Sequence, residues 1–313
     1  MNDMNTFNND PSFSNSMKRN CDAPFSNSTT IKHKKHSSLI ICMLAVIAVV
    51  SLLSSCKLNN VKEDEGLKKY FDEHNLYGCF ALYNNGTGQF TVYNLKRYRD
   101  STYLPASTFK IINSLIGLQT GVISSDSMVI PWDGVQRSID EWNKDLPMYE
   151  AFRVSSVPYY QEVARRIGKD TMQFWLDSLQ YGADKNKKLY KITQIDTFWL
   201  DNSLKITPDQ NLGVVKKLYF NELPFFKINQ EKVKNAMLFE NNANYRLAYK
   251  TGWARTDENH ALGWIVGWIE ENKHPYFFVL NVESPDPNYD MSTVRLKILK
   301  DILKEYGFFE GKM

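Results

Sequence analysis

Two serine–lysine pairs in this chain have the spacing that a nucleophile and its base require. Ser107 is three residues before Lys110, and Ser54 is three residues before Lys57. A helix brings residues three apart onto one face, so either pair could place a hydroxyl beside an amine. Ser-x-x-Lys is a known arrangement for an activated serine. Average residue usage yields about one such pair by chance in a chain of this length, so the spacing alone is weak.

The residues around Ser107 and Lys110 predict a helix that runs from Pro105 to Gly121. Proline at the start and glycine at the end are typical of helix boundaries. The apolar residues between them recur at roughly helical spacing and are Phe109, Ile112, Leu115, Ile116 and Leu118. We therefore predict a largely buried helix with Ser107 in its first turn, near the positive end of the helix dipole.

The residues around Ser54 favour a different interpretation. A basic segment precedes an apolar run at 39–53, which has the length of a signal peptide and is short for a membrane span. The run ends in Leu53-Ser54-Ser55-Cys56, which resembles the lipobox of bacterial lipoproteins; a simple membrane anchor is the alternative. The resemblance implies cleavage before Cys56, lipidation of that cysteine and export to the bacterial cell envelope. Residues 1–55 are then a leader, which removes Ser54, and residues 56–65 a tether.

Composition narrows the class of protein further. The chain has 313 residues, of which 43% are hydrophobic and 23% charged, and its net charge is +3. These are ordinary globular values, and no basic patch indicates a nucleic-acid partner. The four cysteines lack the spacing of metal ligands, so we expect no metal site. Cys79 is the cysteine within the expected folded part, where a buried free thiol is favoured.

Strand patterns flank a mostly helical middle. The predicted strands cover residues 78–83, 89–93, 245–251, 261–270 and 276–282. The predicted helices, besides 105–121, cover residues 66–75, 158–166, 170–180, 208–220, 230–239 and 292–306. We predict an α+β fold: an antiparallel sheet of about five or more strands, flanked by N- and C-terminal helices, within a domain at 66–310. A mainly helical insertion is expected at about 126–241.

Four further features each have an ordinary structural explanation when taken alone. Ser155 could be a helix cap, and Trp199 a core aromatic residue in a loop. Lys250-Thr251-Gly252 could be a turn at a strand end, and Arg295 a solvated helix residue.

Taken together and in this order, these motifs resemble the penicillin-recognising serine enzymes. The order is Ser-x-x-Lys, then Ser-x-Val, then Lys-Thr-Gly. Longer stretches of the chain resemble the class D β-lactamases in particular. These stretches are 105–110, Trp132-Asp133-Gly134, 157–168 and Phe198-Trp199-Leu200. The resemblance extends from about residue 66 to 308, and it implies a β-lactamase/transpeptidase-like fold.

The resemblance implies a role for each residue of the nucleophile's surroundings. Ser107 would attack the lactam carbonyl and form an acyl-enzyme. Lys110 would be the base, carried as a carbamate (N6-carboxylysine) formed with carbon dioxide, and no other cofactor is expected. An apolar pocket would keep the amine neutral enough to react. The Trp199 indole would donate to the carbamate, and the candidate pocket walls are Phe109, Val157 and Leu200.

The remaining positions are assigned to proton relay and substrate binding by the same resemblance. Ser155 would relay a proton to the lactam nitrogen, and Lys250 would supply positive potential. Thr251 and Arg295 would hold the substrate carboxylate, Arg295 as a two-point donor. The oxyanion hole would be the backbone N–H groups of Ser107 and Trp253, beside Gly252.

One motif departs from the family pattern. Where the family usually has Tyr-Gly-Asn on the cleft wall, this chain has Tyr181-Gly182-Ala183. Ala183 offers no side-chain amide, so the placing of this loop and the substrate spectrum stay open.

Three functions compete at this point. The first is hydrolysis of the β-lactam ring of penicillin-type antibiotics, which gives resistance. The second is a penicillin sensor that stays acylated, and the third is a cell-wall D,D-peptidase, which normally has Asn where this chain has Val157. A Ser-His-Asp hydrolase is poorly supported, because no Gly-x-Ser-x-Gly motif is present.

Overall fold

The computed structural model describes residues 60–183, 186 and 188–313. The described part belongs to one compact unit, Asn59–Met313. The proposed lipobox with Cys56 lies outside the described residues. Within the described part, no helix has both the length and the apolar character needed to cross a membrane.

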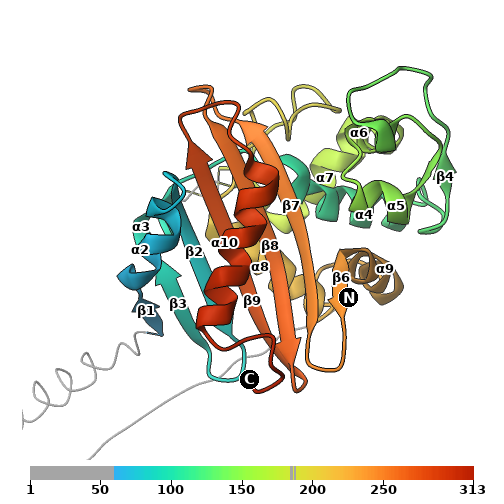
Figure 1. Ribbon diagram of the computed structural model, residues 1–313. Coiled ribbons are helices and arrows are strands. Elements are labelled where there is room, and N and C mark those ends of the chain that lie inside the picture. The colour runs from blue at the N-terminus through green and yellow to red at the C-terminus, as the bar shows by residue number, and fades with distance from the viewer. Residues whose placement is uncertain (1–59, 184–185, 187) are drawn as a thin grey trace, which may run out of the picture. The chain divides into compact units, whose positions relative to one another are not determined.

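A seven-stranded sheet forms the centre of the fold, in the order β1-β3-β2-β9-β8-β7-β6 (Figure 1). Its strands are β1 (Val61–Glu63), β2 (Tyr77–Asn84), β3 (Gln89–Tyr93), β6 (Leu238–Asn241), β7 (Arg246–Arg255), β8 (Ala261–Glu271) and β9 (His274–Ser284). All five strands expected from sequence are present. The sheet is antiparallel except at one edge, where β1 pairs with β3 in parallel. The two unexpected strands are the edge strands, which are too short to show a clear alternation.

Each face of the sheet builds its own hydrophobic core, because successive side chains of a strand point to opposite faces. In β8, Trp264 and Val266 join one core, which includes α4 (Lys110–Gln119). Ile265 and Ile269 join the other core, which is covered by α10 (Met291–Glu305). Figure 1 shows α10 lying along this second face of the sheet. The fold is thus the expected α+β arrangement.

The remaining helical elements connect these strands. They are η1 (Glu65–Leu67), α2 (Lys68–Asp72), α3 (Leu95–Asp100), η2 (Ala106–Phe109), η3 (Asp140–Trp142), α5 (Met148–Arg153), α6 (Val157–Ile167), α7 (Lys169–Leu179), α8 (Pro208–Tyr219) and α9 (Lys227–Met237). The predicted helix at 105–121 is present, but its first turn is the 3-10 element η2. Neither α3 nor α5 was expected, since both are single short helices of six residues.

The segment at 126–241 contains more than helices. It includes a two-stranded sheet of β4 (Val129–Ile130) and β5 (Leu146–Pro147). The helix predicted at 230–239 ends at Met237, and Leu238 begins β6, the edge strand of the main sheet. In addition, α8 packs against β8 and β9. The end of this segment is therefore part of the sheet and not of a separate helical insertion.

Candidate active site

The segment that carries Ser107 is tied to two distant parts of the chain. The Trp264 indole of β8 donates to the Leu104 carbonyl at 3.0 Å, and the Ala106 amide donates to the Trp199 carbonyl at 3.1 Å. Ala106 has a φ of +50°, which a non-glycine residue adopts only when its surroundings enforce it. Ser107 follows in η2, where the first backbone N–H groups have no partner inside the helix. The Ala106 and Thr108 amides already donate to the Trp199 and Pro105 carbonyls. The Ser107 N–H, in contrast, has no backbone partner among the described residues and can bind an oxyanion.

Ser107 and Lys110 form the close pair that their spacing predicts. Lys110 Nζ lies 2.8 Å from Ser107 Oγ, and Lys110 is fully buried. Burial in apolar surroundings lowers the pKa of Lys110 to about 7, because desolvation disfavours the ammonium form. At neutral pH a large fraction of this side chain is therefore a free amine, which can accept the proton of the serine hydroxyl or react with an electrophile.

Aromatic rings form much of the wall around Lys110. Phe109 stacks on Trp199 with ring centroids 5.3 Å apart, and the Tyr160 ring lies 5.5 Å from Lys110 Nζ. Phe109 was expected as a pocket wall from the sequence, whereas Tyr160 was not. Tyr160 is three residues after Val157 on α6, so the helical spacing could have indicated it. The other two candidate walls, Val157 and Leu200, are both half-buried.

Trp199 presents an unused donor in this pocket. Its side chain is fully buried, and its indole Nε1 has no hydrogen-bond partner among the described residues. Buried indole N–H groups usually find a partner, since an unmade hydrogen bond costs about 1–3 kcal/mol. An acceptor beside Lys110, such as the carbamate that the family resemblance implies, fits this orphaned donor.

A second serine–lysine pair comes from residues far apart in the chain. Lys250 Nζ of β7 donates to Ser155 Oγ at 3.0 Å and to the Thr251 carbonyl at 3.1 Å. Ser155 has a φ of +56°, whereas the next residue, Ser156, is the one that caps α6 by accepting from the Tyr159 amide. The capping explanation therefore belongs to Ser156, and Ser155 is free to face Lys250.

Lys250 is held in an unfavourable environment for a charge. Burial lowers its pKa well below the ordinary value, and the nearby charges of Lys110 and Arg295 act in the same direction. The Phe152 ring of α5 lies 5.4 Å from Lys250 Nζ. Three basic side chains thus converge here, and each disfavours the charged form of the others. An anionic group of a substrate would favour their protonated forms.

Strand β7 presents an open edge to this site. Its pairing with β6 stops at Ala248, so Tyr249 to Arg255 have no strand partner on that side within the described part. The edge lies against η2. A Cβ atom at Gly252 would be 3.3 Å from the Pro105 carbonyl oxygen and 3.1 Å from Trp264 Cβ. Glycine at this position therefore allows the strand to approach the nucleophile segment closely.

The other predicted binding residues lie around this edge. Trp253 is 48% exposed, and Thr251 is half-buried. Arg295 Nη1 donates to the Gly252 carbonyl at 2.5 Å, while its buried Nε has no partner among the described residues. Desolvation lowers the pKa of Arg295 to about 10, so the guanidinium still carries its charge at neutral pH. One of its donors is thus committed to Gly252, and the others remain for a carboxylate.

Tyr181 lies in the core behind Phe109 and contributes little exposed surface. It is 4% exposed, and its ring centroid is 5.7 Å from that of Phe109. The open question of the neighbouring loop has a structural answer: the Ala183 carbonyl accepts from Gln210 Nε2 of α8 at 2.8 Å. A backbone contact therefore holds the loop in place without a side-chain amide at Ala183.

No cluster of at least three His, Cys, Asp or Glu residues with metal-binding geometry occurs in the described ranges. Cys79 is a buried free thiol whose pKa burial raises to about 12. It is therefore not a reactive thiolate at neutral pH.

Comparison with known proteins identifies the class of protein to which this fold and its two serine–lysine pairs belong. Residues 78–304 match the penicillin-binding protein transpeptidase domain. The chain is 36% identical over 267 residues to Beta-lactamase OXA-48 of Klebsiella pneumoniae, which covers 85% of this chain and 97% of that protein.

Solved structures agree with this assignment. The class D β-lactamase YbXI from Nostoc has a TM-score of 0.72 and 37% identity, over 78% of this chain and 99% of that one. The C-terminal domain of the Bacillus licheniformis BlaR penicillin receptor has a TM-score of 0.73 and 30% identity, over 80% of this chain and 97% of that one. The chain belongs to the class D serine β-lactamase family, within the penicillin-binding transpeptidase superfamily.

Proposed function

We propose that this protein hydrolyses the β-lactam ring of penicillin-type antibiotics and so confers resistance to them. The observation that carries the proposal is the fully buried Lys110 amine, 2.8 Å from Ser107 Oγ. Ser107 Oγ attacks the lactam carbonyl carbon while Lys110 takes the hydroxyl proton. The backbone N–H groups of Ser107 and Trp253 stabilise the developing oxyanion.

The second pair completes acylation. The C–N bond of the ring breaks, and the Ser155 hydroxyl gives its proton to the nitrogen. Lys250 then supplies a proton to the Ser155 oxygen across their 3.0 Å contact. The positive potential of Lys250, together with Thr251 and Arg295, orients the carboxylate of the antibiotic. The product of this stage is an ester between Ser107 and the opened ring. Attack of water on the ester carbonyl then releases a carboxylic acid and restores the serine.

The same site supports a carbamate on Lys110. A neutral buried amine can add carbon dioxide, and the orphaned Trp199 indole N–H can donate to the group so formed. Carbamylation supplies a carboxylate-like base next to Ser107, for both formation and hydrolysis of the ester. Phe109 and Tyr160 keep the surroundings apolar, which favours the neutral amine over the ammonium form.

Turnover tests the hydrolytic function. Residues 57–313 are incubated with a chromogenic β-lactam, with and without added bicarbonate. We expect many turnovers per enzyme molecule and a higher rate with bicarbonate. The similarity to the BlaR penicillin receptor gives the competing outcome: a stoichiometric burst without further turnover would show a sensor that stays acylated. Rapid hydrolysis of a D-Ala-D-Ala peptide instead would indicate a cell-wall peptidase.

We further propose that the protein is exported and anchored through a lipid on Cys56. The support is the order of basic segment, apolar run and Leu53-Ser54-Ser55-Cys56 in the sequence. Metabolic labelling with a fatty acid in a bacterial host should label the full chain, and Cys56→Ser should not be labelled. Equal labelling of both proteins would overturn the lipidation.

A further inference from the structure

The peptide unit between Val154 and Ser155 sets the direction of the second serine. Ser155 lies between α5 and α6 with a φ of +56°, a region that sterically disfavours residues with a Cβ. Such a conformation persists only where neighbouring contacts hold it. Its own amide donates to the Phe152 carbonyl at 3.2 Å, which is a long contact for the N–H end of that peptide unit.

The carbonyl end of the same peptide unit is held by Trp142. The Trp142 indole Nε1 donates to the Val154 carbonyl oxygen at 3.0 Å. Because a peptide unit is planar, fixing its carbonyl also fixes the amide that leads into Ser155. With both ends of the peptide unit held, the Cβ direction of Ser155 depends on its φ, and at +56° the Oγ lies 3.0 Å from Lys250 Nζ.

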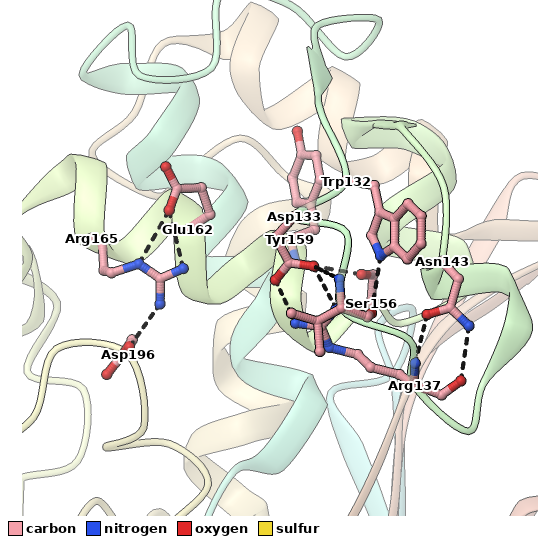
Figure 2. A network of polar contacts seen from close by, with 10 residues as sticks. Trp132, Asp133, Arg137, Asn143, Ser156, Tyr159, Glu162, Arg165 and Asp196 are labelled. Carbon is pink, nitrogen blue, oxygen red and sulfur yellow. Dashed lines mark hydrogen bonds and ion pairs between the residues drawn. The ribbon is translucent and has the colours of Figure 1, made fainter.

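Trp142 belongs to a loop that is stiffened by its own polar contacts, residues 131–145, here called the Trp142 loop. Arg137 donates to both carboxylate oxygens of Asp133, at 2.8 and 2.6 Å. The Asn143 side chain accepts from the Arg137 amide and donates to the Arg137 carbonyl, each at 2.8 Å (Figure 2). Hydrogen bonds from Arg137 hold the pKa of Asp133 well below its usual range, so the carboxylate stays charged. The loop is thus a preformed support for the indole.

We propose that Trp142 is a positioning residue for the proton relay: its indole N–H fixes the Val154 carbonyl and thereby aims Ser155 Oγ at Lys250. The inference rests on the proposed role of Ser155 in acylation. Residues that only pack beside a site change binding and stability, whereas a residue that acts through Ser155 changes the acylation step alone. The loop thereby links a surface segment to the strained residue that protonates the leaving nitrogen.

The matched pair Trp142→Phe and Trp132→Phe tests this in the full chain. Both changes keep an aromatic ring and remove one indole N–H from the same loop, but Trp132 donates at 3.1 Å to Val135 within the loop. The rate constant for acylation is measured with a chromogenic penicillin in a single turnover. We expect Trp142→Phe to slow acylation about tenfold, and Trp132→Phe to leave it within about twofold. Equal effects of the two changes would overturn the proposal.

A double-mutant cycle separates positioning from general damage or direct contact with the substrate. In a Ser155→Ala background the hydroxyl is absent, so Trp142→Phe should no longer slow acylation. If the tenfold loss persists without the Ser155 hydroxyl, Trp142 does not act through Ser155. Circular dichroism and thermal unfolding of all variants check that they fold.

If Trp142→Phe does not fold, Asn143→Ala replaces it in the cycle. This change keeps the indole and removes the two contacts that hold the loop, so it should slow acylation severalfold, again only when Ser155 is present. Loss in both backgrounds would contradict the proposal. Because acylation is measured and not turnover, the result is independent of whether the protein hydrolyses its ester or remains acylated. Failure of the proposed function would appear instead as a wild-type protein that no penicillin acylates.

Discussion

The two serine–lysine pairs are alike in chemistry and opposite in origin. Lys110 Nζ and Ser107 Oγ are 2.8 Å apart on one helical segment. Lys250 Nζ and Ser155 Oγ are 3.0 Å apart, but Ser155 lies in the connection between α5 and α6, and Lys250 lies on strand β7. Local geometry dictates the first pair, because a spacing of three residues places both on one helix face. The second pair exists only because the sheet and the helices pack together.

The two pairs also differ in the contacts that hold them in place. The first pair is surrounded by buried rings and needs only an intact helix and an apolar pocket. The second pair depends on a residue in a strained backbone conformation, and burial and two neighbouring basic side chains disfavour the charged form of its lysine. We therefore expect the first pair to be sensitive to changes that admit water, and the second to changes that relax the backbone around Ser155.

Removal of each hydroxyl gives the largest contrast. Ser107→Ala removes the atom that forms the ester, so acylation by penicillin should fall by about 10⁴-fold or more. Ser155→Ala removes only a proton donor and should slow acylation by about 10²-fold, with the ester still detectable by mass spectrometry. Comparable losses in the two variants, or an ester on Ser107→Ala, would contradict the assignment of nucleophile and relay.

Removal of each amine tests Lys110 as the base and Lys250 as the source of positive electrostatic potential. Lys110→Ala should slow both acylation and ester hydrolysis, ester hydrolysis by about 10³-fold, so that the acyl-enzyme that forms is trapped. Lys250→Ala should mainly slow acylation and weaken binding, because it removes the positive charge opposite the substrate carboxylate. Time-resolved mass spectrometry distinguishes the two outcomes. Accumulation of acyl-enzyme in the Lys250 variant alone would reverse the roles.

The role of the unpartnered Trp199 indole N–H near the first pair can be tested by a substitution that keeps the ring stacking on Phe109. Trp199→Phe removes the unpartnered N–H and should slow ester hydrolysis by about 10- to 100-fold, since charge-assisted hydrogen bonds contribute about 1.5–3 kcal/mol. Added bicarbonate should restore part of the rate in this variant. Trp264→Phe, whose indole bonds to the Leu104 carbonyl, is the matched control and should not respond to bicarbonate. Identical responses would place the acceptor of Trp199 elsewhere.

The smallest expected effect concerns stability. The native pKa of Lys110 is about 7 and its ordinary value is 10.5, so the unfolded chain binds more protons between these pH values. The free energy of unfolding should therefore rise with pH from about 7 to 10, and Lys250 contributes with the same sign. Lys110→Met removes the buried amine at similar volume and should stabilise the fold by about 1–2 kcal/mol at pH 7.

Urea unfolding at pH 6, 7 and 9 measures this, with Lys169→Met, an exposed lysine on α7, as the control. The gain from Lys110→Met should shrink as the pH rises, and the control should show no such trend. A pH-independent gain would mean that packing and not the burial of the amine causes it.

Much of the fold follows from sequence patterns, and the exceptions have physical reasons. Long strands such as β8 and β9 and the amphipathic helix α10 were predicted because their periodicity extends over many residues. The short elements β1, β6, α3 and α5 were missed, since three to six residues carry too little pattern. The strand β6 was also hidden within a predicted helix, because Leu238 and Phe239 continue the apolar spacing of α9. Tertiary pairing with β7 overrides that local preference.

The candidate site divides in the same way. The sequence alone predicted the helix that pairs Ser107 with Lys110, and family resemblance added Ser155, Trp199, Lys250 and Arg295. It did not indicate Tyr160 or Phe152, whose rings border the two amines, nor Trp142 behind the relay. The helical spacing of Val157 and Tyr160 on α6 could have indicated Tyr160. The contacts of Phe152 and Trp142 join residues that no spacing relates, so no local pattern could reveal them.

The sequence by itself determined the first pair, because three residues along a helix are one turn and the backbone needs no other information to bring them together. Only the tertiary structure decided the second. Lys250 and Ser155 are 95 positions apart in the sequence, and they meet at a distance set by the packing of β7 against the helices and by a backbone conformation that local preference opposes. The burial that lowers the pKa of both lysines is likewise a property of the assembled core, since desolvation depends on every element that excludes water from them.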